Sequence, residues 1–170
     1  MDGLLARMVG TAFFNAQSYE AVEADPRATL PAIAVVVMSS IAAAIGAGAL
    51  GLRSIAGMLA AAILSWMIWV LLTLFIGTQI LKRPETHTNF GEILRTTGFS
   101  ASIGILRIFG ILPVVGLPIF VIVEVWMLMT FVIAIRQALD YTSTGRALAV
   151  CLLGWLLHAI VFFGFVRIVV

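Results

Sequence analysis

Long apolar runs alternate with short polar segments along most of the chain. Each run is close to or above the about 20 residues that a helix needs to cross a bilayer. The segments between the runs carry helix-ending residues, and Asn89 with Glu92 matches a capping box at the start of one run. The pattern predicts an all-α, polytopic membrane bundle of five transmembrane helices, at about residues 30–51, 55–81, 91–112, 113–139 and 146–169.

The first 29 residues have a different pattern and form a separate N-terminal segment. Apolar side chains recur there at helical spacing on one face, namely Leu4, Leu5, Met8, Val9, Ala12 and Phe13. An amphipathic helix of this kind either lies in the plane of the membrane surface or packs as a cytosolic helix on the protein's own loops. Both placements stay open. Pro26 disfavours helical geometry at Asp25, so the helix should end there.

The composition agrees with a lipid solvent. Of the residues, 62% are hydrophobic and 11% are charged, against about 45–50% and about 25% in soluble domains. The single cysteine, Cys151, excludes an internal disulfide and a multi-cysteine metal site. No phosphate-binding or dinucleotide motif is present, and no basic run suggests nucleic acid. We therefore expect a non-enzymatic protein with no cofactor, no metal and no nucleic-acid partner, and with the lipid bilayer as its surroundings.

The basic residues at the ends of the spans indicate the orientation. Those on the side of the N-terminus outnumber those on the other side, where Arg53, Arg107 and Arg167 lie. The N-terminal side has Arg7, Arg27, Lys82, Arg83, Arg95, Arg136 and Arg146. Because cytoplasmic loops carry the excess of Lys and Arg, the N-terminus should be cytoplasmic and the C-terminus external.

Three ionisable side chains fall inside the expected spans: Arg107, Glu124 and His158. A charge at the centre of a bilayer costs at least about 2.5–3.5 kcal/mol, so such groups should face the bundle interior and pair. An antiparallel third and fourth span would let Arg107 reach toward Glu124. This polar cluster could relay protons or ions. Alternatively, it could be an ion pair that fixes helix register, with His158 bonded to a neighbouring hydroxyl.

Several short motifs between residues 89 and 160 resemble one family. Phe90-Gly-Glu-Ile-Leu-Arg95 is similar to its entry into a third span, and Gly98-Phe99-Ser100 to a following Gly-aromatic-small step. Further matches are Gly110-Ile-Leu-Pro113-Val-Val-Gly116, Val125-Trp126 and Ile133-Ala-Ile-Arg136-Gln-Ala-Leu-Asp140-Tyr-Thr-Ser-Thr-Gly145-Arg-Ala. The chain thus resembles the Yip1 family of five-span membrane proteins, its bacterial members above all. Many members have a proline shortly after the Gly-aromatic-small step, where this sequence has Ile103 and Gly104, so a kink in the third span stays open.

The resemblance implies a non-enzymatic role in the membrane, here a bacterial plasma membrane. Eukaryotic members act in vesicle trafficking and bind small GTPases through cytosolic regions, and a long N-terminal region of that kind is not expected here. We expect a membrane-organising or partner-binding scaffold, with a cytoplasmic face formed by the N-terminal helix and residues 82–91 and 140–145. Its expected contact residues are Arg136, Asp140 and Tyr141. The alternatives are a small proton or ion channel or transporter, and an accessory subunit of a larger membrane complex. Homo-oligomers or other membrane proteins are possible partners.

Overall fold

The computed structural model describes residues 3–49, 51–84 and 86–169, with side chains in the last helix up to residue 157. All regular structure in these residues is helical. The α-helices are α1 (Leu4–Ala12), α2 (Ala16–Ala24), α3 (Thr29–Gly46), α4 (Leu52–Phe75), α5 (Phe90–Ser100), α6 (Gly116–Ala138) and α7 (Thr144–Val169). The other elements are two 3₁₀ helices, η1 (Pro26–Ala28) and η3 (Ala101–Ile111), and a π-helical turn, η2 (Ile76–Ile80).

Three described helical segments are long and apolar enough to cross a membrane: Pro26–Gly46, Leu52–Ile80 and Gly116–Ala138. Their mean hydropathies lie between 2.2 and 2.4. They correspond to the first, second and fourth spans expected from the sequence, and they mark the chain as an all-α membrane protein. Residues 90–111, expected as the third span, form α5 followed directly by η3.

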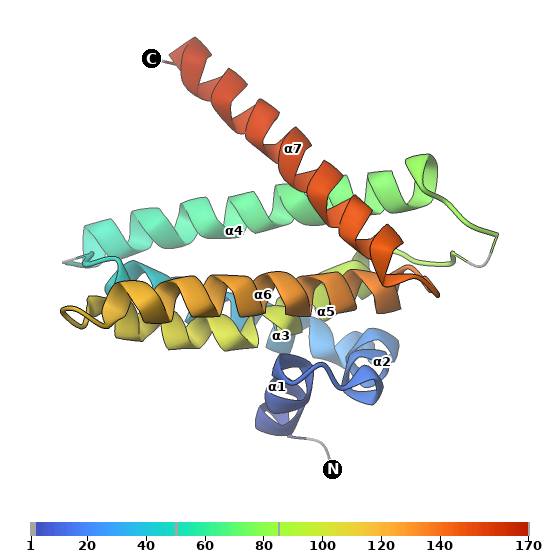
Figure 1. Cartoon of the computed structure of the whole chain (residues 1–170), viewed down its shortest axis with the longest axis horizontal. Helices are drawn as coiled ribbons and strands as arrows, with labels where there is room; N and C mark the ends of the chain where they lie inside the picture. Colours follow the sequence, from blue (N-terminus) through green and yellow to red (C-terminus); the bar gives the residue numbers. More distant parts are fainter. Residues whose placement is uncertain (1–2, 50, 85, 170) are drawn as a thin grey trace.

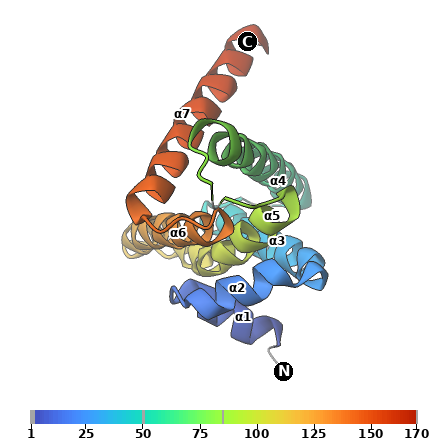
Figure 2. The ribbon, with the colours of Figure 1, turned by 90° about the vertical axis from the view of Figure 1, so that its right-hand side faces the viewer.

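The helices lie in three layers (Figures 1 and 2). The middle layer contains α3, α5 with η3, and α6, and α5 with η3 packs against both α3 and α6. On one side, α4 and α7 cover this layer, and α7 crosses at an angle to α4 and α6 (Figure 1). On the other side lies the short helix pair α1 and α2. The loop at residues 81–89 and the turn at residues 139–143 share one end of the bundle.

The ends of these elements follow local chemistry. The Asn89 side chain accepts from the Glu92 amide while the Glu92 carboxylate accepts from the Asn89 amide, so the expected capping box is confirmed. Helix α3 ends earlier than expected, at Gly46, because a turn follows in which Gly48 takes a φ of +80°. Helix α6 begins later than expected, at Gly116, because a turn with Val114 at φ 70° precedes it.

The switch from α5 to η3 is the main irregularity of the middle layer. An 11-residue 3₁₀ helix is unusual, since most have about 3–4 residues. With three residues per turn it places every third residue on one face. That face holds Ala101, Gly104, Arg107 and Gly110, and it packs on α3.

The contact between α3 and η3 depends on glycine. A Cβ atom at Gly46 would lie 1.8 Å from the carbonyl oxygen of Arg107, and one at Gly110 would lie 3.0 Å from the carbonyl oxygen of Gly46. Near the end of α5, a Cβ at Gly98 would lie 2.8 Å from the Cβ of Ala32 in α3. Backbones approach this closely only where a side chain is missing, which is how small residues join helices in membranes.

The N-terminal helix α1 packs on α5 and η3. Its buried face consists of Met8, Thr11 and Ala12, whereas Leu5 and Phe13 are 74% and 64% exposed. The helix is thus amphipathic, as expected, and it packs on helices and not on loops. It lies against the flank of long helices, with apolar side chains directed outward.

Candidate functional site: an ion pair beside an aromatic-walled cavity

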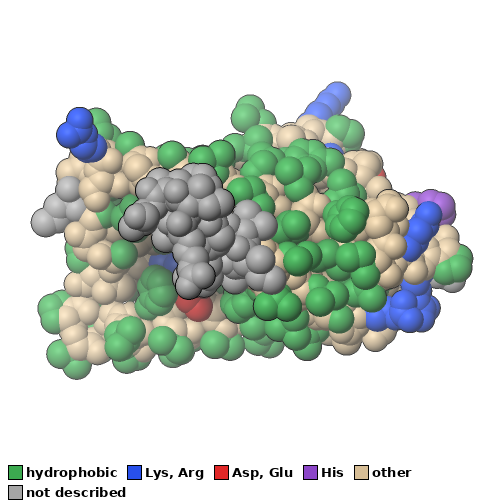
Figure 3. Space-filling view, turned by 90° about the horizontal axis from the view of Figure 1, so that it is seen from above, with side chains coloured by type: hydrophobic (Ala, Val, Ile, Leu, Met, Phe, Trp, Pro, Cys, Tyr) green, Lys and Arg blue, Asp and Glu red, His purple; other side chains and the backbone are tan. Residues whose placement is uncertain are grey.

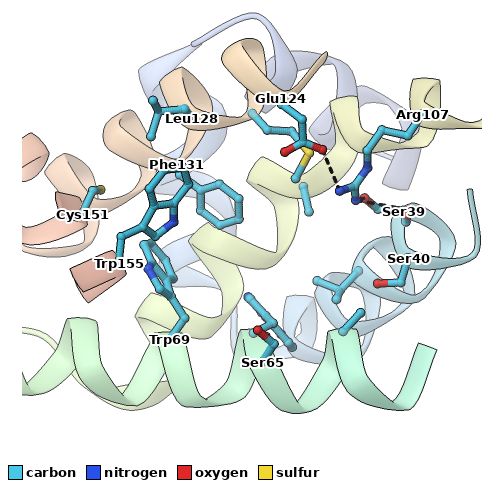
Figure 4. A pocket seen from close by; sticks show the side chains of 15 residues that line it. Ser39, Ser40, Ser65, Trp69, Arg107, Glu124, Leu128, Phe131, Cys151 and Trp155 are labelled. Atoms are coloured by element: carbon cyan, nitrogen blue, oxygen red, sulfur yellow. Dashed lines mark hydrogen bonds and ion pairs between the residues drawn. The ribbon is translucent and has the colours of Figure 1, made fainter. Parts of the chain in front are cut away.

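A partly open cavity of about 340 Å³ lies between α3, α4, η3, α6 and the beginning of α7. Figure 4 shows two unlike ends. The Arg107 and Glu124 side chains meet at one end, near Ser39, and aromatic side chains from α4, α6 and α7 stand at the other. Figure 3, which looks onto the α4 and α7 side, shows an acidic and a basic side chain recessed in the surface.

The ion pair connects three helices. Arg107 Nη1 donates to Glu124 Oε1 at 3.1 Å, which joins η3 to α6. Arg107 Nη2 donates to Ser39 Oγ at 2.8 Å, which adds α3, and Nε donates to the Gly104 carbonyl at 3.1 Å. The antiparallel third and fourth elements thus bring Arg107 to Glu124, as their sequence positions suggested. The contacts give both charges a partner, as charges inside an apolar bundle require.

The two partners of this pair differ in exposure. The Arg107 side chain is 16% exposed and that of Glu124 is 43% exposed. The guanidinium is enclosed by its acceptors, whereas the carboxylate borders the open part of the cavity. The polar end of the cavity therefore presents chiefly an anionic acceptor.

The opposite wall is aromatic. Trp69 and Phe131 pack edge to face with ring centroids 5.1 Å apart, and Trp66 and Trp155 complete the wall. Trp66 Nε1 donates to Thr97 Oγ1 at 3.3 Å. Such edge-to-face pairs are a favoured aromatic geometry. The wall therefore offers a large, fixed apolar surface.

Two polar atoms behind this wall have no hydrogen-bond partner among the described residues: Trp69 Nε1 and Thr73 Oγ1. Both face the same point of α7. A Cβ added at Gly154 would lie 3.4 Å from Trp69 Nε1 and 3.9 Å from Thr73 Oγ1. Burying an unpaired polar group costs about 1–3 kcal/mol, so this contact between α4 and α7 is not optimised for stability.

The remaining member of the expected polar cluster, His158, lies in α7, and its side chain falls outside the described residues. The structure therefore brings Arg107 and Glu124 together and describes no contact of the histidine. The chemistry of the cavity has to be argued from the ion pair and the aromatic wall.

The three residues expected at a partner-binding face turn out to differ in exposure. Tyr141 is buried, at 3% exposure, and its hydroxyl donates to the carbonyls of Leu81 at 2.8 Å and Gly77 at 3.3 Å. Arg136 is half-buried and donates to the Tyr141 carbonyl and to Thr144 Oγ1, both at 3.3 Å. Only Asp140 is exposed. The expectation for Tyr141 is corrected for a physical reason: its hydroxyl satisfies carbonyls that the end of the α4–η2 helix leaves free.

The sequence interpretation missed a second group of polar contacts, which fixes the N-terminal helices to the bundle. Arg95 in α5 is buried and donates from Nε to the carbonyls of Val22 at 3.0 Å and Glu23 at 3.1 Å. Its Nη2 donates to the Glu23 carbonyl as well. The arginine therefore caps the C-terminal end of α2, where the helix dipole also favours a cation. A detectable signal existed, since an arginine this far inside an apolar run needs a partner.

The end of α1 is fixed in the same way. Trp126 Nε1 in α6 donates to the Ala12 carbonyl at 2.8 Å, and the Tyr19 hydroxyl donates to the carbonyls of Thr11 at 2.9 Å and Thr130 at 3.1 Å. Thr11 Oγ1 donates in turn to the Phe99 carbonyl at 3.1 Å. Carbonyls that would be orphaned at the helix ends thus receive donors from the bundle. No sequence signal marks these acceptors, because every residue carries a carbonyl.

Two carboxylates of the N-terminal segment differ in environment. Burial raises the pKa of Glu23 from 4.5 to about 7, the nearby carboxylates of Asp140 and Glu92 add to the rise, and Arg95 opposes it. Asp25 is paired with Arg7 at 2.9 Å, and the hydrogen bond from Arg7 lowers the pKa of that carboxyl. Glu23 is therefore the group of this segment whose charge changes near neutral pH.

Comparison of the chain with family models, with curated proteins and with solved structures gives no match. The functional conclusions below accordingly follow from the residues and their geometry.

Proposed function

We propose that the chain is a five-span, non-enzymatic membrane protein of the Yip1 type that acts as a membrane-organising or partner-binding scaffold. In this proposal α5 with η3 and α7 provide the third and fifth crossings. At rises of about 1.5 Å per α residue and about 2.0 Å per 3₁₀ residue, α5 and η3 together extend about 38 Å. This length exceeds the about 30 Å of a hydrocarbon core. The 3₁₀ geometry supports the proposal because it lengthens an otherwise short element.

The orientation and location belong to the same proposal. The N-terminus, the loop at residues 81–89 and the turn at residues 139–143 face the cytoplasm, the C-terminus faces outward, and the membrane is a bacterial plasma membrane. The distribution of basic residues supports this arrangement. A reporter fused after Val170 tests it, since a cytoplasmic signal from that reporter would contradict the number of crossings or the orientation.

The observation that carries the scaffold function is the docked position of α1. The helix is held by donors from the bundle, and yet Leu5, Val9 and Phe13 remain exposed on its outer side. Its contact at Phe99 lies nine residues from the start of α5, which is about 14 Å along that helix. In this proposal that depth corresponds to a position of α1 within one leaflet. A helix that occupies space in a single leaflet spreads that leaflet relative to the other, and it also offers an apolar ridge to a partner.

The test is vesicle shape after reconstitution. Purified protein in liposomes should tubulate or fragment the vesicles, as seen by electron microscopy. A triple variant Leu5→Ser, Val9→Ser, Phe13→Ser should lose this effect, because the outer ridge no longer enters the lipid. The matched control, Leu5→Met, Val9→Leu, Phe13→Leu, keeps an apolar ridge and should keep the effect. Equal reshaping by the serine variant would contradict a wedge role for α1.

A second candidate function, proton or ion transport, is favoured by the Glu124 carboxylate that borders the cavity. It is tested by flux into liposomes that contain the wild-type protein or Glu124→Gln. Flux through the wild type that disappears in the variant would show transport and would contradict the scaffold function. An absence of flux, combined with poor accumulation of Glu124→Gln, would assign the pair a structural role.

A further inference from the structure

The cavity joins an anionic acceptor to an aromatic wall, and this combination specifies a class of ligand. We propose that the cavity binds a cationic amphiphile, whose ammonium group sits on Glu124 and whose apolar chain lies along Trp66, Trp69 and Phe131. This proposal concerns the interior of the bundle and is independent of the scaffold function, which depends on the outer side of α1.

The charges of the cavity favour an ammonium over an anionic head group. Each of the three Arg107 nitrogens already donates to a protein acceptor, at Gly104, Glu124 or Ser39. An entering anion would therefore find the guanidinium occupied and the more exposed Glu124 carboxylate beside it. An entering ammonium would donate to that carboxylate, and hydrogen bonds between charged groups are the strong ones.

The shape of the cavity favours one apolar chain. Glu124 and Phe131 lie seven residues apart on α6, so the polar and aromatic ends are about 10 Å apart along that helix. The volume of about 340 Å³ is near the lower limit of the about 300–1,000 Å³ that is usual for ligand pockets. It accommodates a head group with part of one chain.

The ligand would enter sideways from the lipid. Helices α4 and α7 line one side of the cavity, and only 28% of the most apolar window of α4 is buried. Two sources supply the required chemistry within a membrane: the ethanolamine head of a phospholipid, and a free alkylamine. Both present an ammonium at the end of an apolar body, and experiment distinguishes them.

The test uses the full chain in nanodiscs of phosphatidylcholine. The probe is a tail-brominated undecylammonium, whose bromine quenches the fluorescence of tryptophans that it contacts. Tail-brominated undecanol and undecanoate serve as neutral and anionic probes of the same length. We expect saturable quenching by the ammonium, and about tenfold or more weaker apparent affinity for the alcohol and the carboxylate, since the alcohol carries no charge to pair with Glu124 and the carboxylate is repelled by it. Equal affinity for all three probes, or a preference for the carboxylate, would overturn the proposal.

Two substitutions locate the binding. Glu124→Gln should weaken ammonium binding about tenfold or more, but it also breaks the ion pair and could impair folding. Ala62→Phe keeps the pair and fills the cavity from α4, so it should abolish saturable quenching. Ala61→Phe places the same side chain at the neighbouring, exposed position and should leave binding unchanged. Unchanged binding in Ala62→Phe would place the ligand elsewhere and contradict the proposal.

The source is settled by repeating the titration in nanodiscs that contain phosphatidylethanolamine. A weaker apparent affinity of the ammonium probe in these nanodiscs, seen equally in the wild type and in the control Ala61→Phe, identifies the phospholipid head as the competing occupant. An unchanged affinity identifies a free amine as the occupant. Either result supports the ammonium site.

Discussion

The two sides of the bundle are packed in opposite ways. Between α3 and η3 the backbones nearly touch, at Gly46 and Arg107, and 44% of the most apolar window of the first segment is buried. On the α4 side, only 28% of the most apolar window of α4 is buried, and tryptophans line a cavity between α4 and the middle layer. In lipid, apolar surface alone does not draw helices together, so small residues and polar contacts decide where they close. The tight side has both, whereas the bulky indoles of α4 hold the other side open.

This contrast assigns different tasks to the two sides. The tight side carries the N-terminal helices, whose carbonyls are bonded to Arg95 and Trp126. The open side holds the ion pair and two of the three buried polar atoms that lack a partner among the described residues, the third being Arg7 Nε in α1. Stability is therefore concentrated on the first side, and space for a ligand on the second. Substitutions that add or remove single atoms test this division directly.

The largest effect is expected where a methyl group is added at a glycine of the tight side, and the same change on the open side serves as the control. Gly46→Ala would place Cβ 1.8 Å from the Arg107 carbonyl oxygen, so α3 and η3 must separate. We expect a loss of about 3 kcal/mol in stability, the upper range for overpacking, measured as a lower midpoint of thermal unfolding in detergent. Gly57→Ala on α4 meets no atom within 4 Å and is the control. Equal tolerance of both alanines would show that the two sides do not differ.

The sequence predicted the parts of this structure that depend on near neighbours. The capping box joins residues three positions apart, and the reach of Arg107 to Glu124 follows from two consecutive antiparallel elements. The 3₁₀ helix was not predicted, although its two glycines, Gly104 and Gly110, lie six residues apart, which is a multiple of three and not of four. The aromatic cavity and the burial of Tyr141 could not be predicted, because they depend on how far helices distant in sequence stand apart.

The next effect concerns the attachment of the N-terminal helices to the tight side. Arg95→Met retains the apolar stem but removes the donors to the carbonyls of Val22 and Glu23. We expect a loss of about 2 kcal/mol, the cost of leaving buried acceptors unpaired, and faster cleavage of residues 13–28 in limited proteolysis. Arg53→Met, at an exposed position of α4, should change neither measurement. Unchanged proteolysis in Arg95→Met would mean that other contacts suffice to hold α2.

A smaller and opposite effect is expected on the open side. Gly154→Ala should stabilise the protein by up to about 1 kcal/mol, because alanine favours helix over glycine and its Cβ would make ordinary contacts. Gly154→Ser has a lower helix propensity, but its hydroxyl can accept from Trp69 Nε1, which has no partner among the described residues. We therefore expect the serine variant to unfold at a temperature at least as high as that of the alanine variant. A serine variant that is clearly less stable than the alanine variant would show that the indole N–H is not accessible from α7.

The smallest effect is a pH dependence at the attachment of α2, because Glu23 is only half-buried and solvent screens most of its charge interactions. Burial raises the pKa of Glu23 to about 7 from 4.5, so the folded state holds this proton more strongly than the unfolded state does. Between these two values the unfolded state loses its proton first, and stability should therefore fall as the pH rises from about 4.5 to about 7 and then level off. Asp25, whose pKa is lowered, acts in the opposite direction and only below its ordinary value of 3.8. Thermal midpoints measured from pH 5 to pH 8 should decline in the wild type and in Glu20→Gln, where Glu23 remains buried, but not in Glu23→Gln. A decline that persists in Glu23→Gln would assign the pH dependence to another group.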